Sequence, residues 1–201
     1  MSRARLIVFA RAPVLGQVKT RLARDIGAPA ALQWYSSLLD ALLTRLQDST
    51  LWQLQVAITP DNAAGAPIGP VPGTQVIPQG NGDLGERMAR LLAQASSEAP
   101  MLIVGSDVPG LERFHVHTAL AALQSHALTL GPATDGGYWL IGASTPPAAQ
   151  LFTNVRWSSP HARGDTLANA QGIAVALLQE LEDIDDLPAY QRYLQRQATR
   201  T

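Results

Sequence analysis

The chain has 201 residues, with 15 Lys or Arg against 16 Asp or Glu, which gives a formal net charge of −1 at pH 7. This balance gives no indication of a nucleic-acid or anionic-membrane surface. The absence of cysteine excludes disulfides, thiolate zinc sites and cysteine nucleophiles. No apolar run approaches a membrane span, and the run at residues 6–10 is too short for a signal sequence. We therefore expect a compact cytoplasmic protein with a single domain over residues 1–201.

The first half of the chain alternates strand and helix patterns. We expect strands at residues 5–10, 51–59 and 74–78, a long amphipathic helix at 29–47 and a second helix from 81 to about 97. Residues 60–73 are rich in Pro, Gly and Ala and have no periodicity, which predicts an exposed loop.

The second half continues the alternation. We expect strands at 102–104, 127–131, 138–142 and 173–178, helices at 112–124 and 187–197, and short helices mixed with loop at 148–169. The strands at 127–131 and 138–142 are joined by a tight turn, so they are candidates for an antiparallel pair. The whole pattern predicts an α/β fold of three layers, with helices on both faces of a mainly parallel, mixed sheet.

The central strand ends in Gly105-Ser-Asp-Val-Pro-Gly. An uninterrupted apolar run before Gly105 is typical of a strand buried on both faces. Asp107 directly follows the carboxyl end of this strand, where open α/β sheets bind ligands. There its carboxylate is expected to hold a divalent cation that in turn holds a phosphate. The alternative is that Asp107 only caps the helix that begins near Glu112.

The first loop, Arg11 to Arg21, contains three cations and one glycine after the first strand. Arg11, Lys19 and Arg21 next to the turn at Gly16 suit a polyphosphate, because charge and free backbone N–H groups act together. The spacing is neither that of a Walker loop nor Gly-x-Gly-x-x-Gly. The alternative is a solvated basic loop that leads into a helix.

A third segment, Gly82-Asp-Leu-Gly-Glu-Arg-Met, opens the second helix. Asp83 and Glu86 have the spacing of a capping box. Gly82 permits the backbone to approach a flat ligand such as a nucleobase. Arg87 lies in the first helical turn, where a cation opposes the helix dipole, so we expect it to bind an anionic partner.

Three later segments also contain candidate functional residues. Asp135-Gly-Gly-Tyr-Trp forms either a plain hairpin turn or backbone that runs along a substrate. The polar stretch from Trp157 to Thr166, which includes Arg163 and Asp165, is a candidate for a loop that closes over the site. The carboxylates of residues 183–186 follow the last strand, and their alternative is a solvated helix N-terminus.

Five motifs occur in an order that resembles the DUF2064 family of glycosyltransferase-A-like (GT-A) proteins, some of them described as transferases associated with radical-SAM and selenium-related domains. They are Phe9-Ala-Arg-Ala-Pro-Val-Leu-Gly-Gln-Val-Lys-Thr-Arg-Leu, Gly82-Asp-Leu-Gly-Glu-Arg-Met, Gly105-Ser-Asp-Val-Pro-Gly-Leu, Asp135-Gly-Gly-Tyr-Trp-Leu-Ile-Gly and Val155-Arg-Trp-Ser-Ser. The family is similar in turn to molybdopterin and phospholactate guanylyltransferases and to nucleotide-sugar-dependent glycosyltransferases.

The resemblance implies a nucleotide-diphospho-sugar transferase fold with the nucleotide at the carboxyl ends of the N-terminal strands. It also implies that Asp107 binds Mg²⁺ or Mn²⁺ bridging the phosphates. The segment at 183–188 is similar to the Asp-x-Asp-x-Pro-Glu-Asp stretch near the end of such transferases. The first loop departs from the pattern, because the nucleotidyltransferases have a Gly-Gly-rich loop where this chain has Ala12-Pro-Val-Leu-Gly16.

These observations predict a metal-dependent transferase that uses a nucleoside triphosphate or nucleotide sugar and a small, possibly phosphorylated, acceptor. The expected catalytic residues are Asp107, Lys19 and Asp135, with the metal on Asp107 and Asp135. The expected nucleotide contacts are Arg11, Gly16, Lys19, Arg21, Gly82, Asp83, Arg87 and Ser106. The alternatives are a nucleotide or sugar-phosphate binder without catalysis and, less favoured, a serine hydrolase, for which the Gly-x-Ser-x-Gly elbow is missing.

Overall fold

The computed structural model describes residues 3–47, 50–64, 68–69, 71 and 73–199. Within them, seven strands form one sheet in the order β3-β2-β1-β4-β6-β5-β7. The strands are β1 (Ala4–Arg11), β2 (Trp52–Thr59), β3 (Gln75–Pro78), β4 (Met101–Gly105), β5 (Leu128–Pro132), β6 (Tyr138–Ala143) and β7 (Val175–Leu177). Both neighbours of β6 pair with it antiparallel, whereas the other neighbouring strands pair in parallel. The expected mixed, mainly parallel sheet is confirmed.

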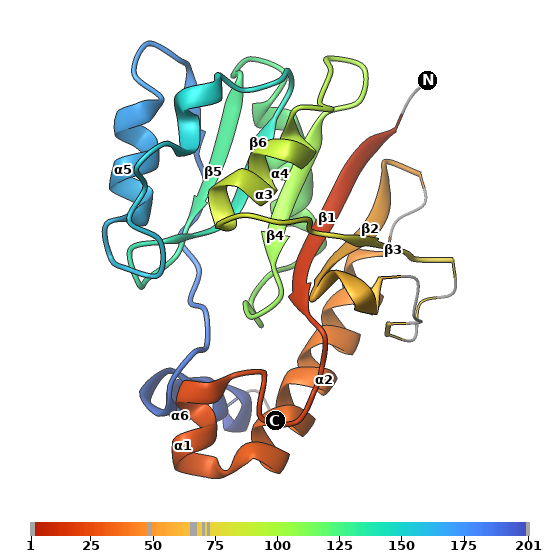
Figure 1. Ribbon diagram of the computed structural model, residues 1–201, viewed down its shortest axis with the longest axis vertical. Helices are drawn as coiled ribbons and strands as arrows, with labels where there is room; N and C mark the ends of the chain where they lie inside the picture. Colours follow the sequence, from red (N-terminus) through yellow and green to blue (C-terminus); the bar gives the residue numbers. More distant parts are fainter. Residues whose placement is uncertain (1–2, 48–49, 65–67, 70, 72, 200–201) are drawn as a thin grey trace.

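Helices cover both faces of the sheet (Figure 1). They are α1 (Thr20–Ile26), α2 (Ala28–Leu46), α3 (Leu84–Leu92), α4 (Arg113–Ala122), α5 (Ala162–Asn169) and α6 (Leu187–Ala198), with short 3₁₀ turns η1 (Asp61–Ala63) and η2 (Ala149–Phe152). Helices α1 and α6 lie together beyond the end toward which β1 points (Figure 1). The three expected layers are therefore present.

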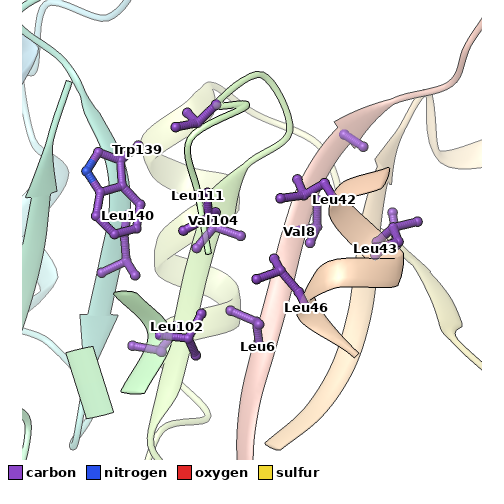
Figure 2. Close-up of a cluster of buried hydrophobic side chains, with 14 of the residues drawn as sticks. Leu6, Val8, Leu42, Leu43, Leu46, Leu102, Val104, Leu111, Trp139 and Leu140 are labelled. Atoms are coloured by element: carbon purple, nitrogen blue, oxygen red, sulfur yellow. The ribbon is translucent and has the colours of Figure 1, made fainter. Parts of the chain in front are cut away.

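The alternation of side chains along β1 explains why helices are needed on both faces. Leu6 and Val8 belong to one buried cluster, and Ile7 between them belongs to a second cluster on the opposite face. In the first cluster, Leu42 and Leu46 of α2 pack against the side chains of β1 (Figure 2). The second cluster includes side chains of α3 and η2. A strand buried on both faces needs the continuous apolar run that the sequence shows here.

The structure differs from the sequence-based expectations at two places, the end of α3 and the end of the first loop. The helix expected to reach about residue 97 ends at Leu92, because Gln94 and Ala95 donate hydrogen bonds only three residues back, and the hydroxyl of Ser96 accepts from the N–H of Ala99. Serine competes in this way with helical hydrogen bonds. The end of the first loop is helical, with α1 beginning at Thr20.

The loop expected at residues 60–73 and the absence of membrane spans can also be compared with the structure. The described part of that loop contains η1, while residues 65–67, 70 and 72 lie outside the described residues. Of the helices that the structure describes, none has the length and apolar character needed to cross a bilayer.

Candidate functional site

Two adjoining cavities open at the carboxyl ends of β1 and β4. The first has a volume of about 560 Å³ and the second about 410 Å³. Both are lined by Gly105 and Asp107 from the end of β4, and by Arg21, Leu84, Ser158 and Asp185. The two cavities therefore form neighbouring lobes of one site, and Asp107 lies at their boundary. Its position just after the carboxyl end of β4 is the one expected from the sequence.

The first cavity brings together the predicted cations. Arg11, Lys19, Arg21 and Arg87 all line it, as does Ser106. The other predicted nucleotide contacts, Gly16, Gly82 and Asp83, are not among the residues that line either cavity.

The segment at the start of α3 forms the capping box that the sequence predicts. Asp83 Oδ1 accepts from the N–H of Glu86 at 2.9 Å, and Glu86 Oε2 accepts from the N–H of Asp83 at 2.8 Å.

Arg87 is held in place by hydrogen bonds within the protein. It donates to Gln79 Oε1 at 2.8 Å and to the carbonyl of Asp83 at 3.1 Å. Its side chain is thus fixed at the wall of the first cavity.

Lys19 is the most constrained of the cations. Its backbone is left-handed, with φ of 47°, and its side chain is only 7% exposed. The ammonium group donates to Asp107 Oδ2 at 2.9 Å and to Asp185 Oδ1 at 3.5 Å. Burial lowers the pKa of Lys19, but the charge and hydrogen bond of Asp107, with the charge of Asp185, outweigh this and raise it above its ordinary value. Lys19 is therefore a permanent cation that holds two carboxylates together.

Asp185 is a site residue that the sequence motifs did not single out from its acidic neighbours. Besides Lys19 it binds Arg21, whose Nη1 donates to Asp185 Oδ2 at 2.9 Å. The next residue, Asp186, instead caps α6 by accepting from the N–H of Ala189. The similarity noted in the sequence covers residues 183–188 as a whole, so only the contacts of Lys19 and Arg21 distinguish Asp185 within that segment.

Asp183 lies on the side of the second cavity. Its pKa is raised to about 6, first by burial and then by the negative charges of Asp107 and Asp135. All three carboxylates line this cavity. Burial therefore contributes most to the raised pKa, and the two neighbouring carboxylates add to it more than the charge of Lys19 offsets.

Sequence reasoning also missed the polar residues that fix the floor of the first cavity. The hydroxyl of Tyr35 donates to the carbonyl of Arg11 and accepts from its N–H, both at 3.0 Å, and lies 3.3 Å from Ser106 Oγ. Gln79 is 4% exposed, and its amide donates to the carbonyls of Ala10 and Ala57. These residues lie outside the recognised motifs, so only the fold brings them together.

The glycine-rich turn before β6 packs beneath the segment Trp157–Pro160. Gly136 has φ of 89°, and a Cβ there would lie 2.4 Å from the carbonyl oxygen of Pro160. Asp135 Oδ1 accepts from the N–H of Gly137 at 2.7 Å, which tightens the turn. The turn thus makes an Asp-Gly hairpin and at the same time builds one wall of the second cavity.

A divalent cation fits the chemistry of this site. Mg²⁺ and Mn²⁺ prefer carboxylate oxygens, and Asp107 and Asp185 present theirs to one ammonium group, so the two carboxylates lie close together. The described residues contain no group of three or more His, Asp or Glu side chains already arranged as metal ligands. Two carboxylates with phosphate oxygens are a usual Mg²⁺ environment.

Solved structures with a similar fold define the class. A protein from Desulfovibrio desulfuricans G20, provisionally described as a nucleotide-diphospho-sugar transferase, is 28% identical and has a TM-score of 0.82, with 92% of this chain and 84% of that chain covered. CMP:2-keto-3-deoxy-manno-octonic acid synthetase, solved with CTP, is 14% identical, with a TM-score of 0.58 and full coverage of both chains. Rv0371c from Mycobacterium tuberculosis H37Rv, solved with manganese, is 15% identical, with a TM-score of 0.53 and coverage of 96% and 100%. The fold is that of the nucleotide-diphospho-sugar transferases.

The family follows from the sequence match. The model of a family of uncharacterized proteins conserved in bacteria, DUF2064, matches residues 42–159, and the chain belongs to this family. No curated protein gives a significant sequence match.

Proposed function

We propose that this protein is a metal-dependent transferase that takes a nucleoside triphosphate or a nucleotide sugar as donor and transfers a nucleotidyl or glycosyl group to a small acceptor. The observation that supports this most directly is the buried Lys19 ammonium, which holds Asp107 and Asp185 at the boundary of two cavities. One cavity then serves the donor and the other the acceptor, with the reacting bond between them.

The first cavity is the proposed donor site. Arg11, Lys19 and Arg21 supply positive charge for the phosphates, and Arg87 lies on the same wall. The Tyr35 hydroxyl fixes the backbone of Arg11 and is itself in contact with Ser106 Oγ, so the loop is already positioned before a ligand arrives. Positioning and charge neutralisation are the main contributions of a protein to phosphoryl and nucleotidyl transfer.

Asp107 and Asp185 are the proposed metal ligands, and Asp135, across the second cavity, stays a predicted one. When bound, Mg²⁺ or Mn²⁺ supplies charge stabilisation to the transferring group and the leaving phosphate. In nucleotidyl transfer, an acceptor oxygen bonds to the α-phosphorus and pyrophosphate leaves. In glycosyl transfer, the acceptor oxygen bonds to the anomeric carbon and a nucleoside diphosphate leaves. Lys19 and Arg21, which line the first cavity, are the proposed contacts for the negative charge of either leaving group.

Titration calorimetry with CTP, GTP, UTP and ATP, with and without Mn²⁺, tests the donor site. Asp107→Asn is expected to weaken Mn²⁺-dependent binding by at least about 100-fold, because loss of a direct ligand costs no less than loss of a supporting residue. Asp25→Asn is the matched control, since Asp25 is exposed on α1 and lines neither cavity. Unchanged affinity in Asp107→Asn with an intact fold would refute the metal assignment.

A non-catalytic nucleotide or sugar-phosphate binder is the second candidate on the same fold. The two are separated by Mn²⁺-dependent release of pyrophosphate from triphosphates, or of nucleoside diphosphate from nucleotide sugars, in the presence of a broad acceptor set. Tight donor binding without release of either product would favour the binder.

A further inference from the structure

The second cavity differs from the first in the sign of its charge. Asp107, Asp135, Asp183 and Asp185 all line it, whereas Arg21 is its one cationic lining residue among those described. Arg21 is bound to Asp185 and its side chain is 63% exposed, so it faces solvent as much as the cavity. Among the described ion pairs, none neutralises Asp135 or Asp183.

The lining of this cavity is also aromatic and hydroxylated. Trp157 and Tyr138 line it, with their ring centroids 6.3 Å apart in an edge-to-face arrangement. Ser158 and Ser159 follow Trp157, and Ser158 has left-handed backbone with φ of 55°. Ring surfaces and carboxylates in one cavity form an amphipathic lining, in which apolar surfaces give affinity and a few polar groups give orientation.

We propose, on the basis of the transferase function above, that the second cavity takes an unphosphorylated, hydroxyl-rich acceptor such as a sugar or polyol, and discriminates against phosphate esters. Hydroxyl groups donate to carboxylates in charge-assisted hydrogen bonds, whereas a phosphate beside Asp135 and Asp183 meets like charge. The C–H face of a sugar ring suits the rings of Trp157 and Tyr138. For a phosphate group, the one described cation that lines this lobe is Arg21, and it is already paired with Asp185.

The acceptor nucleophile is then a hydroxyl oxygen. It forms the new bond to the α-phosphorus or to the anomeric carbon of the donor, while pyrophosphate or nucleoside diphosphate leaves and the hydroxyl proton is released to water. This chemistry fits the position of the second cavity, which shares Asp107 and Asp185 with the donor lobe.

The test compares matched pairs, D-glucose with glucose 6-phosphate, D-ribose with ribose 5-phosphate and glycerol with glycerol 3-phosphate. Binding to the metal-free full chain is measured by calorimetry, together with Trp157→Ala and Trp34→Ala. Trp34 is the matched control, because like Trp157 it is half-buried and packs against two aromatic rings, here Tyr190 and Tyr193, but it lines neither cavity. A phosphate ester that binds in the first, basic cavity should keep its affinity in Trp157→Ala. Only binding that weakens in Trp157→Ala is therefore attributed to the second cavity.

We expect at least one unphosphorylated compound to lose about tenfold in affinity in Trp157→Ala and to keep it in Trp34→Ala. Its phosphate ester should show no loss that depends on Trp157. The inference would be overturned if the phosphate esters, rather than the unphosphorylated compounds, lost affinity in Trp157→Ala. It would also be overturned if none of the unphosphorylated compounds lost affinity in that variant. Mn²⁺-dependent binding of triphosphates is measured in parallel for wild type and for Trp157→Ala. If wild type does not bind triphosphates, the donor function is refuted. If wild type binds triphosphates but phosphate esters are the compounds that depend on Trp157, only the acceptor class is refuted.

Discussion

The carboxyl group of Asp183 should make the protein less stable at neutral pH than it would be with a neutral side chain. Its pKa is raised to about 6 by burial and by Asp107 and Asp135. The folded state therefore binds this proton more tightly than the unfolded state, and stability falls as pH rises from about 4 to about 6. Asp183→Asn removes the ionisation and keeps the shape of the side chain, so the variant should be more stable at neutral pH.

The magnitude follows from the raised pKa. The change in the pKa of Asp183 from 3.8 to about 6 on folding corresponds to ~3 kcal/mol of unfolding free energy. Since Asp183 is only partly buried, solvent screening reduces this to about 1.5 kcal/mol. For a chain of this length, that difference raises Tm by about 3–6 °C. Below about pH 4 the wild-type carboxyl is protonated in both states, and the advantage of the variant should vanish.

Urea denaturation of both proteins in EDTA, from about pH 4 to pH 7.5, measures this difference directly. Adding Mn²⁺ is the control, because a cation at Asp107 and Asp185 would compensate the charge and reduce the advantage of the variant. If Asp183→Asn were only as stable as wild type at every pH, or less stable than wild type at neutral pH, then burial and the neighbouring carboxylates would not raise the pKa of Asp183.

Further predictions concern the first loop and the glycine turn. Lys19→Ala and Arg21→Ala should weaken CTP and GTP more than the corresponding nucleosides in calorimetry, by ~10–100-fold for buried Lys19 and only a few-fold for exposed Arg21; equal losses for both ligand types would contradict phosphate recognition. Gly136→Ala should lose ~2 kcal/mol more than Gly172→Ala in urea denaturation, because both glycines have φ above 80° but only Gly136 has a close neighbour, Pro160. Equal losses would contradict the close packing of the turn.

The sequence predicted well the features that depend on local patterns. The buried strand before Gly105, the capping box at Asp83 and the long helix at 29–47 each follow from spacing over a few residues, and the structure has all three. The pairing of β5 with β6 followed from the tight turn between them. The position of Asp107 at the site edge of the sheet followed because the carboxyl ends of parallel strands lie at one edge, whereas its role stays a prediction.

Contacts between distant segments were not accessible in this way. Lys19 and Asp185 are 166 positions apart, and nothing in the spacing of either segment indicates that one ammonium binds both Asp107 and Asp185. The buried amide of Gln79 and the hydroxyl of Tyr35 were missed for the same reason. A residue whose role is to fix another residue has no motif of its own, so its partner must be known first.

The antiparallel strand β6 explains why the two lobes of the site differ in charge. In a purely parallel sheet, only carboxyl ends of strands would meet at this edge. Because β6 runs opposite to β4, with Val104 paired to Leu140, its amino end lies beside the carboxyl end of β4. The turn at Asp135 and the start of β6 at Tyr138 therefore face Asp107, while the cations of the first loop lie on the other side, after β1. The change in strand direction thus places a basic lobe and an acidic, aromatic lobe on either side of Asp107, and the proposal of a charged donor and an uncharged acceptor rests on this asymmetry.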